Sequence, residues 1–105
     1  MQYFPLFADL KGRAVLLVGA GEVATRKAES LLQAGADIRV VARELGPAFL
    51  DWQNEGRIQW LAREFQPEQL QDVFLVVSAT GDAEVDSQVF KAAQARANAD
   101  RKSVV

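Results

Sequence analysis

The sequence predicts an α/β domain built on one parallel sheet, and three observations lead to that expectation. Short apolar runs alternate with segments of helical character along the chain, as is typical of strands buried between two layers of helices. A Gly19-Ala20-Gly21 turn separates the first apolar run from the first helical segment. Half of the 105 residues are apolar, so a single domain of this length can bury a core.

The first strand and the first helix flank the glycine turn. We expect the strand over residues 14–18 and the helix from about residue 23 to residue 34. The residues expected on the inner face of this helix are Val23, Lys27 with its aliphatic stem, Leu31 and Ala34. Gly35 then ends the helix, because glycine takes the left-handed conformation that follows many helices at little cost.

The middle of the chain predicts two further strands and two short helical segments. The second strand is expected at residues 37–41 and the third at residues 58–61. Between them, Pro47 favours the first turn of a helix that closes at a turn at Gly56. A single helical turn is expected at residues 67–70.

A strand, a long helix and a stub of a strand complete the prediction. They are expected at residues 73–79, residues 83 to about 97, and residues 102–105. The apolar stripe of the long helix is expected to consist of Val85, Val89, Phe90 and Ala93. Right-handed crossovers then give a Rossmann-like sheet of order 3-2-1-4-5 with helices on both faces. In that order the glycine turn and Thr80-Gly81-Asp82 converge on one ligand crevice.

The segment from Gly19 to Ala24 has the spacing of a dinucleotide-binding turn. The first amides of a helix lack partners within the helix and carry partial positive charge, so a pyrophosphate can bind bare backbone there. Gly19 allows the tight turn, Gly21 the approach of phosphate oxygens, and Ala24 close packing of helix on strand. The alternative is a tight turn in an α/β protein that binds nothing.

Composition excludes several other classes of function. The formal charge of −2 and the pI near 5.1 give no reason to expect a nucleic-acid or anionic-membrane surface. The chain has no cysteine and no histidine, which removes disulfides, thiolate nucleophiles and the commonest metal ligands. No apolar run reaches the roughly 20 residues of a membrane span. We therefore expect a cytoplasmic protein without a resident metal.

Several motifs together resemble one known family. They are Phe4-Pro5-Leu6-Phe7, Leu10-Lys11-Gly12-Arg13, Val18 to Ala24 followed by Arg26-Lys27, Leu31 to Ala36, and Ala79-Thr80-Gly81-Asp82 with Val85. In these the chain resembles the amino-terminal domain of siroheme synthase, that is, the precorrin-2 dehydrogenase and sirohydrochlorin ferrochelatase family. Arg26-Lys27 is the most specific part, since ordinary dinucleotide folds do not need it, although a solvated helix face also explains it.

The resemblance implies that residues 1–105 form one NAD-binding Rossmann domain of an enzyme that oxidises precorrin-2 to sirohydrochlorin. It also implies iron insertion into the product and a homodimer in the full-length enzyme. The cofactor-binding residues that it implies are Gly19, Ala20, Gly21, Glu22 and Val23 through the main chain, Arg43 and Glu44 beside the adenosine ribose, and Thr80 on the nicotinamide side.

The catalytic residue stays unassigned at this stage. The resemblance places it in an Asn-x-x-Asp type segment on the fifth strand, whereas residues 100–105 read Asp-Arg-Lys-Ser-Val-Val. Asp100 is a poor substitute because it precedes the strand. We therefore expect a truncated, cofactor-binding part of a larger enzyme that is inactive alone. Basic groups such as Arg13 or Lys102 could meet tetrapyrrole carboxylates, but their spacing does not single them out.

Several alternatives remain open at the level of sequence. Arg43 favours NADP on the general rule for such folds, while Glu44 and the resemblance favour NAD, which we predict. Thr80 and Asp82 could cap the following helix as well as face a ligand, and Asp86 is expected at a solvated helix position. The rival functions are a nucleotide-sensing regulatory module without catalysis and a purely structural domain.

Overall fold

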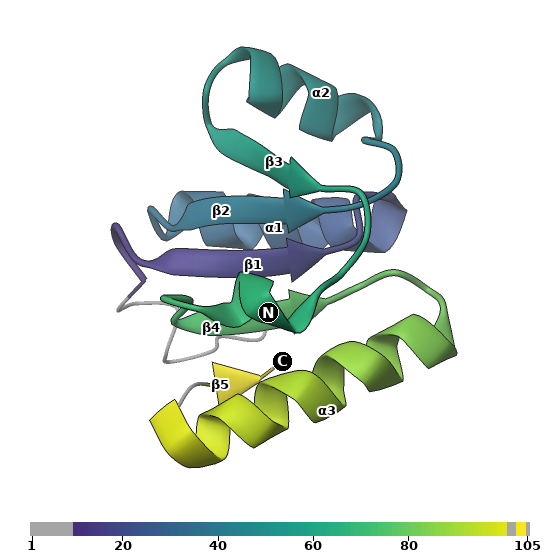
Figure 1. Cartoon of the computed structure of the whole chain (residues 1–105). Coiled ribbons are helices and arrows are strands. Elements are labelled where there is room, and N and C mark those ends of the chain that lie inside the picture. The colour runs from purple at the N-terminus through teal and green to yellow at the C-terminus, as the bar shows by residue number, and fades with distance from the viewer. Residues whose placement is uncertain (1–9, 101–102, 105) are drawn as a thin grey trace.

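The computed structural model describes residues 10–100 and 103–104 and confirms the predicted architecture. Its elements are β1 (Ala14–Val18), α1 (Glu22–Gln33), β2 (Asp37–Val41), α2 (Pro47–Asn54), β3 (Ile58–Ala62), the 3-10 helix η2 (Pro67–Leu70), β4 (Leu75–Ser78), α3 (Ala83–Asp100) and β5 (Ser103–Val104). All strand pairs are parallel, and the sheet order is β3-β2-β1-β4-β5 (Figure 1). The 3-2-1-4-5 order is therefore that of a Rossmann-like fold.

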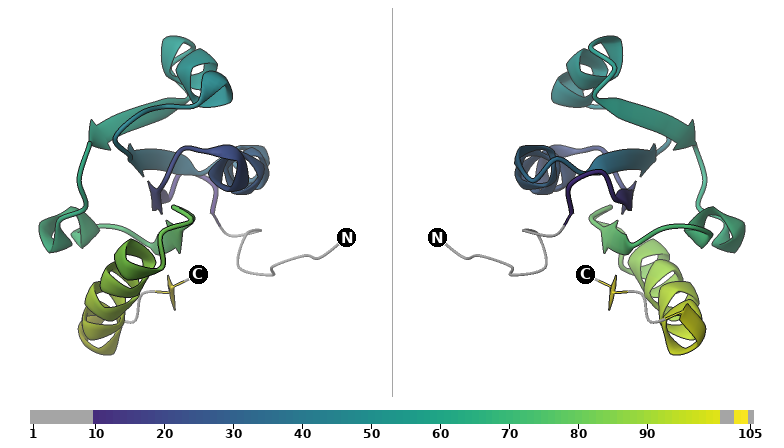
Figure 2. Two further views of the ribbon diagram at one scale, coloured as in Figure 1. Left: turned by 90° about the vertical axis from the view of Figure 1, so that its right-hand side faces the viewer. Right: turned by 90° about the vertical axis from the view of Figure 1, so that its left-hand side faces the viewer.

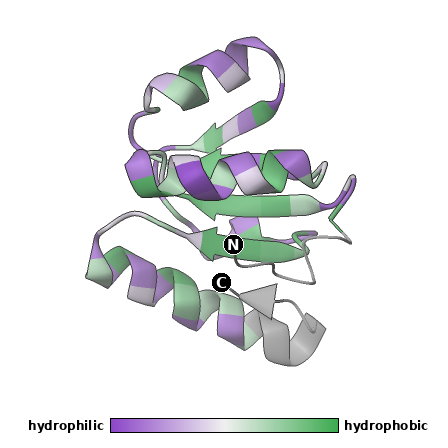
Figure 3. Cartoon of the chain, turned by 180° about the vertical axis from the view of Figure 1, so that it is seen from behind, coloured by the Kyte–Doolittle hydropathy of each residue, from purple (hydrophilic) through white to green (hydrophobic). Residues whose placement is uncertain are grey.

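Helices cover both faces of the sheet, as predicted. Figure 2 shows α1 and α2 on one side of the strands and η2 and α3 on the other. Because successive strand side chains point to opposite faces, β1 supplies Val15 and Leu17 to one apolar cluster and Leu16 and Val18 to the other. The four residues are at most 2% exposed. This two-sided burial explains why β1 is apolar along its whole length, as Figure 3 shows for the central strands.

Two predicted helix faces are wrong in part. Val23 and Phe90 were expected to face the core, but they are 59% and 51% exposed. The buried face of α1 consists of Ala24, Ala28 and Leu31, which have the i, i+4, i+7 spacing of one helix face. Two small residues on that face let α1 pack closely on the sheet, and the sequence prediction had favoured larger side chains. The inner face of α3 includes Val89 and Ala93, as expected.

The strand ends differ slightly from those predicted. β4 begins at Leu75 rather than at residue 73, because the Val73 amide donates to the Leu70 carbonyl and so belongs to the turn after η2. Gly35 and Gly56 have φ of +80° and +75°, which agrees with their expected role in ending helices. The Phe4-Pro5-Leu6-Phe7 motif and Lys102 lie outside the described residues.

Candidate functional site

A crevice of about 270 Å³ lies at the carboxyl edge of the sheet, where the loops after four strands meet. The predicted site residues that line it are Gly19 and Ala20 after β1, Arg43 and Glu44 after β2, and Thr80 after β4. Arg63 and Glu64, in the segment after β3, also line it. The predicted convergence of the β1 and β4 loops is therefore present in the structure.

Gly19 is fixed by the packing of two loops. Its φ is +116°, a conformation that residues with a side chain rarely adopt. Its amide donates to the Val41 carbonyl at 2.8 Å. A Cβ atom on Gly19 would collide with the carbonyl oxygen of Ala79. A glycine is therefore needed here for the β1 loop to lie against the end of β4.

Gly21, unlike Gly19, could carry a side chain without a collision or a strained backbone conformation. It is the N-cap of α1 with φ −93° and ψ −157°, and no side chain caps the helix. Its carbonyl accepts hydrogen bonds from the amide and the hydroxyl of Thr25, at 2.9 and 2.8 Å. A Cβ atom on Gly21 would meet no atom within 4 Å. No side chain of the protein therefore caps the first turn and the Cβ position of Gly21 is open, an arrangement that suits an anion.

The glycine turn is also held from the side of α2. The Gly46 amide donates to the Ala20 carbonyl at 3.0 Å, and a Cβ on Gly46 would lie 2.7 Å from the same oxygen. Ala24 is fully buried beneath the turn. Three small residues therefore let α1, α2 and the β1 loop approach one another, as expected of Ala24.

The remaining predicted residues of the turn lie beside the crevice rather than in it. Gly21 and Glu22 line a neighbouring open hollow of about 470 Å³ together with Arg26. Val23 lies at the exposed start of α1 and lines neither hollow. The five predicted residues of the turn are therefore divided between the crevice, the neighbouring hollow and the exposed start of α1.

Thr80 and Asp82 combine the two roles that the sequence left open. The Asp82 carboxylate caps α3, since its Oδ1 accepts from the amides of Glu84 and Val85 at 3.0 and 3.4 Å. The Thr80 hydroxyl accepts from the Asp82 amide at 3.0 Å. Both residues also line the crevice. The capping interactions therefore hold the β4 loop in place at the wall of the site.

Asp86 does not occupy the solvated position that the sequence suggested. It is half-buried, and its Oδ1 accepts from the hydroxyls of Ser78 and Thr80 at 2.6 and 2.7 Å and from the Thr80 amide at 3.4 Å. Burial raises the pKa of Asp86, but these three hydrogen bonds outweigh it and leave the pKa below its ordinary value. The Asp86 carboxylate therefore holds Thr80 in place through hydrogen bonds to its hydroxyl and its amide. Sequence reasoning missed this because the partners lie six and eight residues away.

Replacing Asp86 with alanine is expected to lower the free energy of unfolding by about 1–2 kcal/mol at neutral pH, since Ser78 and Thr80 lose their acceptor. Because the folded pKa is lowered, the stabilisation by the charged form is present above the ordinary aspartate pKa and is lost as pH falls through the folded pKa. Urea unfolding across acidic pH measures both effects. Exposed Asp51→Asn is the control, and equal acid sensitivity of Asp86→Asn and wild type would contradict the assignment.

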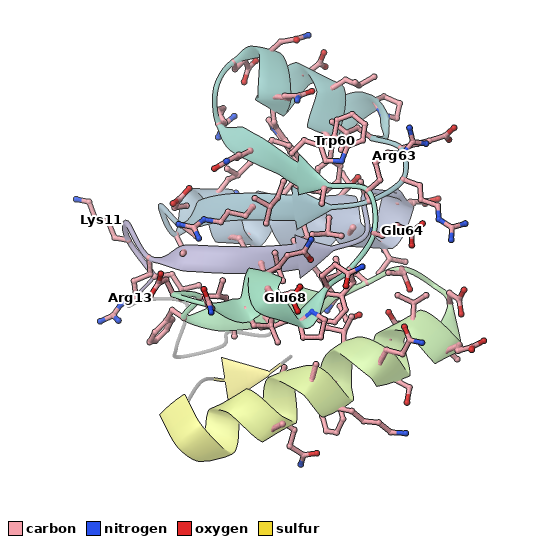
Figure 4. The ribbon with its side chains drawn as sticks, viewed as in Figure 1. Lys11, Arg13, Trp60, Arg63, Glu64 and Glu68 are labelled. Atoms are coloured by element: carbon pink, nitrogen blue, oxygen red, sulfur yellow. The ribbon has the colours of Figure 1, made fainter. Side chains whose placement is uncertain are left out.

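Arg13 lies away from the crevice. Its guanidinium carbon lies 4.3 Å from the centre of the Phe74 ring, a cation–π contact. Figure 4 shows Lys11 and Arg13 at the edge opposite to the one that carries Arg63 and Glu64. Arg13 therefore has a structural partner and does not contribute to the crevice.

The described residues contain neither a membrane-spanning helix nor a metal-binding cluster of acidic side chains. No helix within residues 10–100 and 103–104 combines the length and the apolar character needed to cross a bilayer. In the same part of the chain, no three acidic side chains come close enough together to hold a metal ion.

Comparison with known proteins agrees with the sequence resemblance. A family model described as "Putative NAD(P)-binding" matches residues 6–101. Siroheme synthase 1 of Serratia proteamaculans is 51% identical over 96 residues, and siroheme synthase 1 of Yersinia enterocolitica is 54% identical over 96 residues. Each alignment covers 91% of this chain and 20% of the relative. The chain therefore spans about a fifth of the length of these relatives.

A solved structure of "SirC, precorrin-2 dehydrogenase" has a similar fold. It superposes with a TM-score of 0.73 at 40% sequence identity, over 78% of this chain and 41% of that chain. The family resemblance that was inferred from the motifs is thereby confirmed.

Proposed function

This chain belongs to that NAD(P)-binding family, and from its membership we propose that it binds NAD at the carboxyl edge of the sheet. The observation that carries the proposal is the uncapped start of α1, where Gly21 leaves the first-turn amides open beside the crevice. Such amides favour a pyrophosphate. A single dinucleotide-binding domain over residues 1–105 is part of the same proposal.

The chain's own residues fit the cofactor in three parts. The main chain of residues 19–23 holds the pyrophosphate, because these positions offer amides and the partial positive charge of the helix start. Arg43 and Glu44, after β2, flank the adenosine ribose. Thr80, anchored by Asp86, lies on the nicotinamide side.

We further propose that the reaction is the oxidation of precorrin-2 to sirohydrochlorin in siroheme biosynthesis. The support comes from the siroheme synthase relatives and from the precorrin-2 dehydrogenase structure. NAD supplies the hydride acceptor when it is bound. The role of this chain is to orient the nicotinamide and to exclude water around it.

The base that removes the accompanying proton stays unassigned. Asp82 and Asp86 do not suit this role, because their carboxylates accept hydrogen bonds that hold the β4 loop and α3. For the full-length protein we propose iron as a second substrate, a homodimer, and a cytoplasmic location. The formal charge of −2 favours neither nucleic acid nor an anionic membrane as a partner.

Titration of the purified chain with NAD tests the proposal. At NAD concentrations ten times the dissociation constant, we expect stabilisation by about 1.4 kcal/mol, because the ligand binds only the folded state. Thermal unfolding and calorimetry measure it. No stabilisation at millimolar dinucleotide would favour a structural domain. Binding of NAD without oxidation of precorrin-2 by the full-length protein would favour a nucleotide-sensing module.

A further inference from the structure

Two arginines and two glutamates surround the crevice where β2 and β3 end. Arg43 and Glu44 follow β2, and Arg63 and Glu64 follow β3. The Arg43 Nε group donates to Glu64 Oε1 at 3.0 Å. The other glutamate, Glu44, is exposed beside this pair. Figure 4 shows Arg63 and Glu64 at the edge of the sheet toward which the strand arrowheads point.

The backbone beneath this ion pair is held in place by Trp60. The Trp60 indole N–H donates to the carbonyls of Ala42 and Ala62 at 2.9 and 3.1 Å. The Ala42 amide also donates to the Ala62 carbonyl at 3.0 Å. The two segments that carry Arg43 and Glu64 are therefore tied together one or two residues before the pair. These two hydrogen bonds give Trp60 a structural role in linking the segments that follow β2 and β3.

The register of β3 also contributes to the position of Glu64. Val40 pairs with Trp60, but Val41 pairs with Ala62, so an irregularity in β3 skips Leu61. Such bulges bend a strand and redirect the side chains that follow it. The β3 bulge and the hydrogen bonds of the Trp60 indole jointly bring Glu64 within reach of Arg43.

We propose that Glu64 is a specificity-determining residue that makes the crevice prefer NAD to NADP. This inference rests on the proposed function. A 2′-phosphate on the adenosine ribose carries about −1.5 to −2 charges at neutral pH and is usually met by an arginine fork. The Glu64 carboxylate already binds the Nε edge of the Arg43 guanidinium, and it adds a negative charge beside that guanidinium. A neutral 2′-hydroxyl is not repelled in this way.

The alternative source of selectivity is Glu44 alone, on the general rule for an acidic residue after the second strand. The two explanations differ in the role of Arg43. If Glu64 acts in part by holding Arg43, its removal benefits NADP more when Arg43 is present than when Arg43 is absent. If Glu44 acts alone, removal of Glu64 has no effect on the ratio of the two affinities.

The test is calorimetric titration of the 105-residue protein and its Glu64→Gln variant with NAD and with NADP. We expect Glu64→Gln to bind NADP about five- to tenfold more tightly, because a like charge is removed and an arginine fork is released. NAD affinity should change less than about threefold, since an exposed pair contributes little by itself. The gain for NADP should shrink as salt rises from low to high concentration.

Two further variants make the outcome specific. In Arg43→Gln, the added Glu64→Gln change should favour NADP clearly less than it does when Arg43 is present, which a double-mutant cycle measures. The matched control is Glu55→Gln, because Glu55 pairs with Arg57 at 3.6 Å on an exposed surface away from the crevice. An unchanged NAD to NADP ratio in Glu64→Gln would overturn this inference and leave the proposed function intact. If the wild-type protein binds neither dinucleotide, both fail.

Discussion

Gly21→Asp is expected to abolish NAD binding, with a loss of more than about 100-fold in affinity, while the protein stays folded. An aspartate at this N-cap places its carboxylate on the first-turn amides, where we propose that the pyrophosphate binds. It also adds a negative charge against a negative ligand. Calorimetric titration with NAD measures the loss.

The stability of the Gly21→Asp protein is expected to stay the same or to rise slightly. The backbone at Gly21 has φ −93° and ψ −157°, which residues with a side chain adopt readily, and a Cβ there meets no atom within 4 Å. Aspartate is in addition a favourable N-cap. Gly21→Ala, which adds bulk without charge, is the matched control and should lose affinity to a smaller degree. Undiminished NAD binding by a folded Gly21→Asp protein would exclude the first turn of α1 as the pyrophosphate site.

The sheet and its glycine turn could be predicted because local pattern and buried environment agree. Residues 14–18 are apolar throughout, since both faces of β1 are covered, and Gly19 interrupts that run where the chain must turn. Chain direction and crossover handedness then restrict the strand order. The convergence of the β1 and β4 loops follows from that order without any knowledge of side-chain contacts.

The parts that could not be predicted depend on contacts between distant segments. Asp86 meets Ser78 and Thr80 only after the β4 loop has folded back on α3. Glu64 reaches Arg43 across 21 residues, and the β3 bulge that helps to place it leaves no clear pattern in the sequence. A partial signal was available for Glu64, because residues after β3 end at the same edge of a parallel sheet as those after β2.

The exposed positions of Val23 and Phe90 have a different origin. Hydrophobic periodicity marks an apolar stripe, but it does not decide which side of a broad stripe packs against the sheet. In α1 the small side chains of Ala24 and Ala28 face the sheet, and the larger Val23 points outward. Residue size therefore mattered as much as hydrophobicity, since close approach of helix and sheet was needed to form the glycine turn.

Gly19→Ala is expected to destabilise the fold by about 3–5 kcal/mol, the second large effect that we predict. Two costs add at this position. The φ of +116° is strained for any residue with a Cβ, and that Cβ collides with the Ala79 carbonyl oxygen. Ala79 cannot move away freely, because its amide donates to the Val18 carbonyl at 2.8 Å within the sheet. Urea unfolding measures the loss.

Gly56→Ala is the matched control, since it separates strain from collision. Gly56 also has a positive φ, +75°, but a Cβ there meets no atom within 4 Å. Its replacement should cost only about 1–2 kcal/mol, the usual cost of a side chain in the left-handed region. The difference between the two variants measures the contact between the β1 loop and the end of β4. Equal stability of Gly19→Ala and Gly56→Ala would mean that the contact with Ala79 does not constrain the glycine turn. That contact would then not explain how the first-turn amides of α1 are held in position.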